Sequence, residues 1–300
     1  MRISVWPDQS RPWPEIATLV DHAEASGWDG VYVYDHFMAN DPNNEYVGAP
    51  VLEAWTTLTA IAARTSRLRL GTLVLGNLYR HPAVVARMAA TLDLISNGRL
   101  ILGLGAGWQV NEHASFGIDL TPPGPRMDQF EEACGVITSM LRNERTDFTG
   151  EYYRITSAPI EPRPRQAHLP ILIGAKGELR GLKAAAKYAD EWNAWTTPET
   201  FRHKSGLLDR FCEELGRDPH SIIRSTQASI ELTATPSDAV VTFDRRPLLR
   251  GTAAQVAEAM SDYHAAGVAE FIVPDDAEIP IAQRLDELDE LINVVFAGLR

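Results

Sequence analysis

The chain has 300 residues, of which 45% are hydrophobic, and it carries a formal net charge of −12 at pH 7. This acidic balance argues against a nucleic-acid-binding or anionic-membrane surface, although a local positive site can still hold an anionic small molecule. The two cysteines, Cys134 and Cys212, lack a CxxC partner; we expect neither a disulfide framework nor a zinc site, and a reducing cytoplasm is the natural setting.

Short apolar runs alternate with longer amphipathic stretches along the whole chain. The short runs predict strands, and apolar residues that recur every three or four positions predict helices. Gly27 follows the first helical stretch as a C′ glycine would, and Pro82 fits the first turn of another. We expect eight pairs of a strand and the helix that follows it. Written as strand/helix, they are residues 3–6/13–26, 30–36/53–66, 68–76/82–95, 100–108/126–143, 170–175/178–189, 191–196/198–216, 224–233/252–266 and 270–274/281–299.

These eight pairs predict an α/β fold. The strands lack a clean polar alternation, which suits a parallel sheet that is covered on both faces. An open doubly wound sheet gives the same alternation, but the number of pairs favours a (β/α)8 TIM barrel, since both chain ends take part. We see no domain boundary and predict one domain over residues 1–300. Residues 108–169 would be the strand-4 to strand-5 connection with an insertion, including the hairpin-like "FTGEYYRI".

The second predicted strand ends in two ionisable side chains, Asp35 and His36. In a TIM barrel the active site lies at the carboxyl ends of the strands. Because neighbouring strand residues point to opposite faces, at most one of the two points into the mouth. His36 could exchange a proton near neutral pH, and Asp35 could orient it or bind a cofactor hydroxyl. A rim pair that closes the strand end is the structural alternative.

Glycines are frequent where the fourth strand ends, in "LGLGAGW" at residues 102–108. Their GxGxG spacing differs from the GxGxxG of a dinucleotide loop, so we reject a Rossmann interpretation. Bare backbone at Gly105 and Gly107 would suit a flat ring laid against the barrel mouth. Glycines tolerated for packing explain the same pattern equally well.

The segment "ILIGAKGE" at residues 171–178 predicts a strand, a tight turn and the start of a helix. Backbone N–H groups, the helix dipole and Lys176 would together make an anion site. The segment lacks the GxxxxGK[ST] pattern of a P-loop. A solvated lysine in an ordinary loop is the alternative.

Other chemistries have no support in the sequence. Neither HExxH nor another close metal-ligand pair is present, so no metal is expected, and there is no GxSxG serine elbow. The start "MRISVW" is no export signal, and no window approaches the roughly 18 apolar residues of a membrane span. Four tryptophans near predicted strand ends would be core residues or could wall an aromatic ligand: Trp6, Trp108, Trp192 and Trp195.

Taken in order, several stretches resemble the luciferase-like monooxygenase superfamily, in particular its branch that uses the deazaflavin coenzyme F420. They are "AEASGWDGVYVYDHF", "LRLGTLVLGNLYRHPAVVARMAATLDLISNGRLILGLGAGWQVNE", "FTGEYYRI" and "PILIGAKGELRGLKAAAKYADEWN". The resemblance covers essentially the whole chain. It implies a TIM barrel with insertions, commonly a homodimer, that binds a small-molecule substrate.

The resemblance also implies a set of site residues. Asp35 and His36 match the Asp-His pair at the cofactor mouth, where the histidine is a candidate proton donor or acceptor. A non-proline cis peptide is common in the third strand, and here it would join Leu73 and Val74. The residues implied for cofactor binding are Asp35, His36, Thr72, Leu73, Val74, Gly105, Gly107, Asn111 at the cofactor side chain, and Gly174, Ala175 and Lys176 at its phosphate.

Two positions depart from the sugar-phosphate dehydrogenases of the superfamily. Asn40 stands where those enzymes have a tryptophan, and Trp108 stands where they have a glutamate acid/base. The resemblance therefore implies an F420-dependent oxidoreductase with a substrate other than a sugar phosphate. An FMN-dependent monooxygenase and a non-catalytic flavin-binding or deazaflavin-binding barrel are the alternatives.

Overall fold

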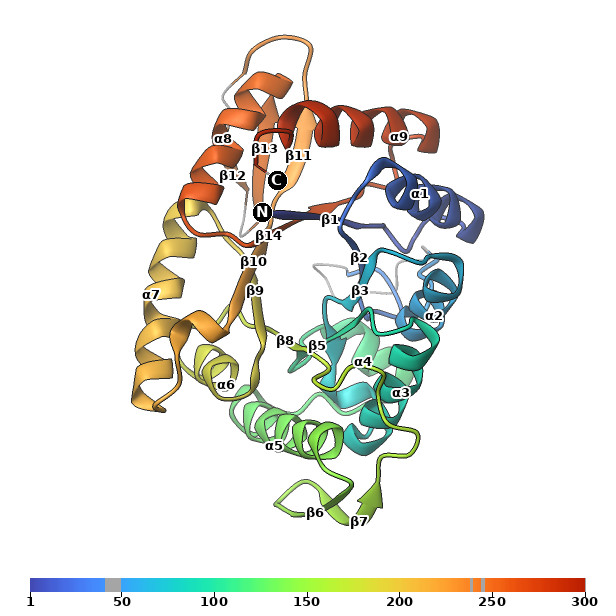
Figure 1. Ribbon diagram of the computed structural model, residues 1–300, viewed down its shortest axis with the longest axis vertical. Coiled ribbons are helices and arrows are strands. Elements are labelled where there is room, and N and C mark those ends of the chain that lie inside the picture. The colour runs from blue at the N-terminus through green and yellow to red at the C-terminus, as the bar shows by residue number, and fades with distance from the viewer. Residues whose placement is uncertain (41–49, 238–239, 244–245, 300) are drawn as a thin grey trace.

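The computed structural model describes residues 1–40, 50–237, 240–243 and 246–299. Parallel strands close into a barrel that helices surround (Figure 1), which confirms the predicted (β/α)8 fold. The barrel closes where β3 pairs with β5, and Leu70 lies beside Leu100 there. Around the barrel the strands are β1 (Arg2–Trp6), β2 (Gly30–Val33), β3 (Arg69–Thr72) with its continuation β4 (Leu75–Gly76), β5 (Leu100–Gly105), β8 (Ile171–Gly174), β9 (Glu191–Trp195), β10 (Ile223–Gln227) and β14 (Glu270–Pro274).

Helices cover the outside of the barrel because most of them have an apolar face. α1 (Trp13–Ser26) buries Ile16, Leu19 and Val20, and Gly27 ends it with a left-handed φ of 91°, as predicted. Pro82 lies in the first turn of its helix, also as predicted. The other α-helices are α2 (Ala54–Arg64), α3 (Pro82–Ile95), α4 (Val110–Phe116), α5 (Pro123–Arg142), α6 (Arg180–Tyr188), α7 (Pro198–Glu214), α8 (Ala253–Ala265) and α9 (Ile281–Glu290).

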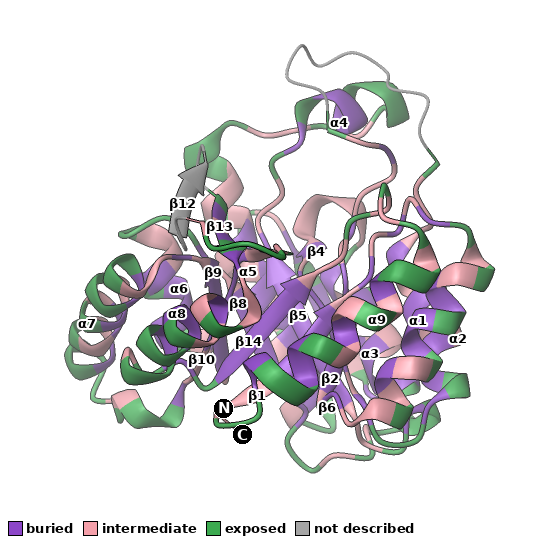
Figure 2. Ribbon diagram, turned by 90° about the horizontal axis from the view of Figure 1, so that it is seen from above, coloured by how far each residue is buried: buried purple, intermediate pink, exposed green. Residues whose placement is uncertain are grey.

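The long connection between β5 and β8 contains the predicted insertion. Its hairpin consists of β6 (Arg145–Thr149) and β7 (Arg154–Pro159), which pair antiparallel. The same connection carries α4, which lies at one end of the barrel, whereas both chain termini lie at the other end (Figure 2). α4 therefore adds cover at the end of the barrel where the strands finish.

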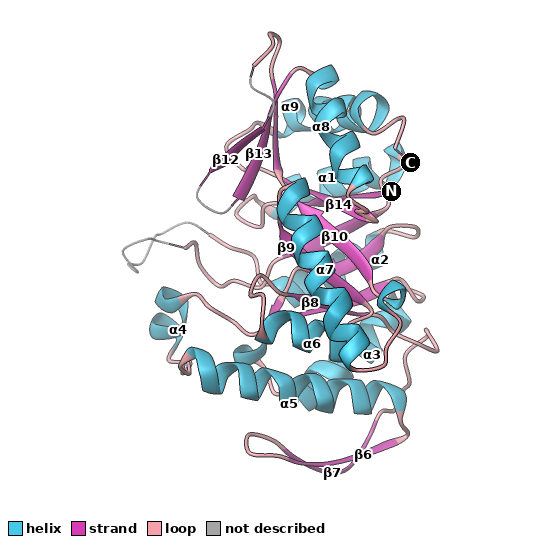
Figure 3. Cartoon of the chain, turned by 90° about the vertical axis from the view of Figure 1, so that its left-hand side faces the viewer, coloured by secondary structure: helices cyan, strands magenta, loops and turns pink. Residues whose placement is uncertain are grey.

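The prediction of a single strand at residues 224–233 is wrong. β10 ends at Gln227 inside the barrel, and β11 (Ser229–Leu232) belongs to a separate three-stranded sheet. In that sheet β13 (Arg246–Gly251) pairs with β11 and with β12 (Val240–Phe243) (Figure 3). The apolar pattern continues through Ala228, so it does not reveal that the two halves pair with different, distant strands.

A small apolar cluster fills the barrel interior. Trp6 and Val74 pack against it from the carboxyl ends of their strands. Its fully or nearly fully buried members are Tyr32, Leu73, Ile101, Leu172 and Ile272. The barrel is therefore a packed core below its mouth, and a ligand has room only above this layer.

A charged network closes the opposite, amino-terminal end of the barrel. Arg69 donates to Glu191 over 2.5 Å and to Glu270 over 2.6 Å, and both carboxylates are buried. Ser4 also donates to Glu270 over 2.6 Å, and Arg2 lies 3.1 Å from the same carboxyl group. Burial of these charges is tolerable because each carboxylate has a cationic partner.

Arg69→Met tests this network through the stability of the fold. The change should lower the free energy of unfolding by about 3–5 kcal/mol, because it removes the main partner of two buried carboxylates. Urea unfolding at neutral pH measures the difference. Arg64→Met removes the exposed pair with Asp21 and serves as a control that should leave the midpoint nearly unchanged. Equal midpoints for both variants would contradict the role given to Arg69.

Within the described part of the chain, no helix is long and apolar enough to cross a membrane. The same residues contain no group of three or more side chains that could hold a metal ion.

Candidate active site

The end of β2 places His36 at the carboxyl end of the barrel, where a buried carboxylate holds it. His36 Nδ1 lies 2.7 Å from Oε1 of Glu112, whose side chain is fully buried, whereas 24% of the His36 side chain is exposed. The Phe37 N–H donates to the other Glu112 oxygen over 2.8 Å, and the Tyr79 hydroxyl donates to Oε1. One carboxylate thus joins three segments of the mouth.

These hydrogen bonds set the charge of Glu112. Burial favours its protonated form, but the bonds from His36, Tyr79 and Phe37 outweigh burial and hold the pKa of the Glu112 carboxyl below its ordinary value. Burial and the same carboxylate raise the pKa of Tyr79, which stays a hydroxyl donor. An ionised carboxylate can only accept, so the proton between the two side chains is on His36 Nδ1. Nε2 is then the atom of His36 that can take up a proton.

Asp35, beside His36, has a different position. It is 3% exposed, and its carboxylate accepts two hydrogen bonds from Arg80, over 2.7 and 3.0 Å. The Gly76 N–H donates to it over 2.9 Å. Arg80 also reaches Glu53, the N-cap of α2, over 2.6 Å. Asp35 therefore ties the end of β2 to β4, and its predicted contact with a cofactor stays a prediction.

The junction of β3 and β4 lies beside β5, with which both strands pair. The peptide bond between Leu73 and Val74 is cis, as the resemblance implied. Thr72 exchanges hydrogen bonds with the backbone of Gly103, over 2.8 and 2.9 Å. Leu73 belongs to the apolar cluster inside the barrel, and Val74 packs against it.

The strand glycines make room for this junction. A Cβ on Gly103 would lie 1.8 Å from the Thr72 carbonyl oxygen, and one on Gly105 would lie 2.5 Å from Val74. Val74 would also meet a Cβ on Gly174 at 2.9 Å. The Val74 side chain therefore fills the space beside Gly105, and the predicted contact of Gly105 with a cofactor ring stays a prediction. Gly107 lies beyond the strand with a φ of +83°, a conformation that favours glycine.

Three side chains anchor the segment that starts α4. Asn111 is buried and donates to the Ala39 carbonyl over 3.0 Å. Gln109 donates to the Met38 carbonyl over 3.0 Å. Together with Glu112 they fasten α4 to the loop that follows β2. The predicted contact of Asn111 with a cofactor side chain stays a prediction.

The predicted anion-binding turn follows β8. Ala175 N donates to the Asn193 carbonyl over 3.0 Å, and Lys176 is exposed. Lys204 of α7 donates to the Lys176 carbonyl over 2.9 Å and so brings a second ammonium group to this turn. The prediction that a helix starts at residue 178 is wrong, because a turn intervenes and α6 begins at Arg180. The helix dipole therefore acts on this turn from further away than expected.

Aromatic rings line the mouth from one side to the other. Trp6 and Trp195 lie 5.9 Å apart, Trp6 and Tyr34 6.2 Å, and Tyr34 and His36 5.9 Å, between ring centroids. Trp108 lies edge-on to His36 at 5.4 Å. Three of the four tryptophans expected near strand ends are thus at the mouth. The fourth, Trp192, is fully buried and donates to the Ala175 carbonyl over 3.0 Å.

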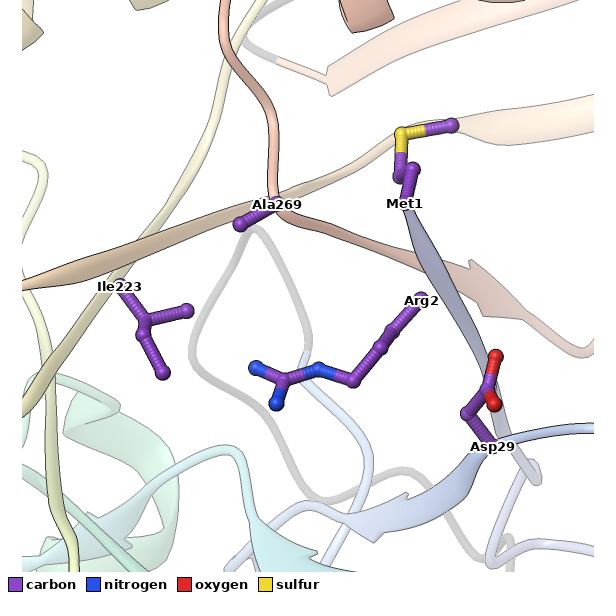
Figure 4. Close-up of a pocket in the computed structure, with 5 residues that line it drawn as sticks. All are labelled: Met1, Arg2, Asp29, Ile223 and Ala269. Carbon is purple, nitrogen blue, oxygen red and sulfur yellow. The ribbon is translucent and has the colours of Figure 1, made fainter. Parts of the chain in front are cut away.

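A cavity of about 530 Å³ lies at the amino-terminal end of the strands, away from His36. Met1, Arg2, Asp29, Ile223 and Ala269 line it. The Arg2 side chain extends across this opening toward Ile223 (Figure 4). Because Arg2 already serves the network of Glu191 and Glu270, we assign this cavity to the closed end of the barrel.

Sequence reasoning missed Glu112, Tyr79 and Arg80. Glu112 stands directly after Asn111 in "QVNEH", at the carboxyl end of a predicted strand, so its position was a signal. Its partner His36 is 76 positions away, and only the closed barrel brings the two together. Arg80 shows no signal in the sequence that distinguishes it from a surface arginine.

The fold and the site define a TIM-barrel protein with a histidine–carboxylate pair at the carboxyl ends of its strands. Residues 1–250 match the model of the luciferase-like monooxygenase family, and the chain belongs to that family.

Some of the similar proteins are named as F420-dependent enzymes, whereas others are named as monooxygenases. Over 168 residues the chain is 38% identical to an F420-dependent glucose-6-phosphate dehydrogenase of Amycolatopsis mediterranei, covering 56% of this chain and 47% of that protein. Over 232 residues it is 33% identical to an enzyme of the same name from Kineococcus radiotolerans, covering 75% and 66%. The chain thus spans about half to two thirds of these relatives. The solved structure of an F420-dependent secondary alcohol dehydrogenase with an F420–acetone adduct shares the fold, with a TM-score of 0.84, 20% identity and 98% of each chain covered.

The charge of Glu112 predicts a pH dependence of stability. Its pKa is lowered from 4.5 in the folded protein, so the ionised form stabilises the fold above that pH, and the contribution is lost as the pH falls through the lowered value. Glu112→Gln should reduce the free energy of unfolding by about 1–3 kcal/mol near neutral pH. The difference should shrink below about pH 4.

Urea unfolding of both proteins across this pH range measures the effect. Glu258→Gln, at an exposed position of α8, is the matched control and should show no such trend. A difference between wild type and Glu112→Gln that stays constant down to the lowest pH would contradict an ionised Glu112.

Proposed function

We propose that the protein is an oxidoreductase that uses coenzyme F420 and transfers a hydride between the deazaflavin and a small organic substrate. The observation that carries this proposal is the His36–Glu112 pair, with Nδ1 of the imidazole held at 2.7 Å. A proton-transfer group in the mouth of a barrel of this family is what a hydride-transfer reaction requires besides the coenzyme. The relatives named as F420-dependent dehydrogenases support the choice of coenzyme.

The residues at the mouth fit a ring with polar edges. Trp6 and Gln227 are the last residues of β1 and β10. Among the described residues, the Trp6 indole nitrogen and the side-chain amide oxygen of Gln227 are buried without a hydrogen-bond partner. Buried polar atoms are normally satisfied, so a donor and an acceptor at these two strand ends favour a ligand with complementary groups there. Lys176, on the turn after β8, suits its phosphate, and Lys204 of α7 lies beside this turn, where it pairs with Glu178 at 3.0 Å.

The protein's own residues would handle the proton. F420, when bound, supplies or accepts the hydride. Oxidation of an alcohol releases a proton as well as a hydride, and His36 Nε2 would take up that proton. In the reverse direction His36 would return the proton to the substrate oxygen. Glu112 accepts the Nδ1 hydrogen bond in both states, so it fixes the ring and stabilises the imidazolium form.

Further expectations from the sequence belong to the same proposal. We infer a homodimer, a cytoplasmic setting and a substrate that is a small molecule other than a sugar phosphate. Asn40 and Trp108 support a substrate other than a sugar phosphate, because the sugar-phosphate dehydrogenases of the superfamily have other residues at these two positions. Nucleic acid is not an expected partner of this acidic chain.

Cofactor titration tests the proposal. Quenching of tryptophan fluorescence should show binding of F420 in the micromolar range and much weaker binding of FMN, because Trp6, Trp108 and Trp195 lie at the mouth. Micromolar binding of FMN without binding of F420 would contradict the proposal in favour of a flavin-dependent monooxygenase. Binding of neither would favour a non-catalytic barrel.

Lys176→Ala tests the phosphate end of the site. If the ammonium group pairs with the cofactor phosphate, the change should weaken F420 binding by about 1–2 kcal/mol. Lys183→Ala removes an exposed lysine of α6 that lies over Phe211 and is the matched control, which should leave the affinity unchanged. Equal affinities of both variants and the wild type would mean that backbone N–H groups alone hold the phosphate or that the phosphate binds at another loop.

A further inference from the structure

One continuous aromatic wall crosses the mouth of the barrel and ends at a cation. Consecutive ring centroids along it are 5.4–6.2 Å apart. At one end, the guanidinium of Arg246 lies 5.1 Å above the Trp195 ring. In spatial order the wall consists of Trp195, Trp6, Tyr34, His36 and Trp108.

The wall is open to a ligand at both of its ends. Trp108 is 52% exposed and stands beside the candidate catalytic histidine. At the other end, Arg246 is exposed, and none of the described carboxylates forms an ion pair with it. Arg246 belongs to β13, which lies at the same end of the barrel as α4 (Figures 2 and 3).

The acidic groups near the wall are already engaged. The Tyr34 hydroxyl donates to Asp8 over 2.9 Å, and the backbone N–H of Ser10 donates to the same Asp8 oxygen over 2.8 Å. Glu112 is buried behind His36. Within the described part of the chain, Arg246 is thus the charged side chain that the open end of the wall presents to a ligand, and its charge is positive.

We propose that this wall binds the substrate and that the substrate is a flat aromatic molecule carrying a carboxylate. The inference rests on the proposed function and names the substrate class of that same site. Rings stack against other rings with a gain beyond the burial of area alone, and a guanidinium pairs with a carboxylate through two parallel hydrogen bonds. The wall offers few polar groups to the hydroxyls of a sugar, so a sugar phosphate would leave its hydrogen bonds unmade there.

The wall also brings the substrate to the proton. His36 is itself one of the five rings, so a flat molecule stacked on its neighbours lies next to Nε2. A carboxylate that pairs with Arg246 would set the position of the substrate along the wall. The cation and the histidine therefore fix the position of the reacting carbon between them.

Three probes and two variants test this inference on protein saturated with F420. Titration calorimetry compares 2-naphthoate, its uncharged analogue 2-naphthalenemethanol, and glucose 6-phosphate. We expect 2-naphthoate to bind about ten-fold more tightly than the alcohol because of Arg246. Glucose 6-phosphate should bind more weakly than 2-naphthoate.

Arg246→Gln should weaken 2-naphthoate about ten-fold and leave the alcohol unchanged, because only the acid uses the guanidinium. Trp108→Ala should weaken both naphthalene probes about five-fold, because it removes part of the stacking surface. The matched controls are Arg250→Gln on the same strand, where the arginine pairs with Glu231 at 3.0 Å, and Leu215→Ala at the exposed residue that follows α7. Thermal unfolding checks that each variant is folded.

Three outcomes would overturn the inference. They are tighter binding of glucose 6-phosphate than of 2-naphthoate, the absence of binding of either naphthalene probe, or a loss of F420 affinity in Arg246→Gln as large as the loss for 2-naphthoate. The last outcome would assign the wall to the cofactor. Failure of F420 itself to bind the wild type would instead contradict the proposed function, so the two failures are distinguishable.

Discussion

The carboxylate of Glu112 is the interaction on which the site depends. It is fully buried, and a buried charge of this kind is tolerable only when hydrogen bonds replace the lost water. Here the donors come from the end of β2 and from Tyr79 in the 3₁₀ turn η1 (Asn77–Tyr79). The charge therefore selects one arrangement of α4, β2 and η1, and in that arrangement His36 keeps Nδ1 occupied and Nε2 available for a proton.

A second buried carboxylate holds the mouth of the barrel together on the other side of β2. Asp35 is buried and binds Arg80 and the backbone of Gly76, so it fixes β4 as Glu112 fixes α4. Val74 fills the space that Gly105 and Gly174 leave. The mouth is thus rigid along β2, β4 and β5, while Trp108 and Arg246 remain exposed. A rigid proton site beside an open aromatic wall suits the proposed transfer between a held cofactor and a variable substrate.

Much of the fold and part of the site could be predicted from the sequence. The eight strand–helix pairs predicted the barrel, because the strands of a buried parallel sheet are recognisable as short apolar runs. The barrel in turn predicted that Asp35 and His36 lie at the carboxyl end of a strand. The cis bond at Leu73–Val74 came from family resemblance and not from any local pattern. Glu112 and Arg80 were missed because their partners lie 76 and 45 positions away. The split of residues 224–233 between two sheets was missed because pairing with distant strands decided it.

The tautomer of His36 is the most direct test of this account. Nitrogen-15 NMR of histidine-labelled protein at alkaline pH distinguishes a proton on Nδ1 from one on Nε2, and a His36→Asn variant assigns the signal. The account predicts that the neutral ring of His36 carries its proton on Nδ1 in the wild type and that this preference weakens in Glu112→Gln. A proton on Nε2 in the wild type would contradict it, because Glu112 would then be no acceptor for His36 and Nε2 would not be free to take up a proton.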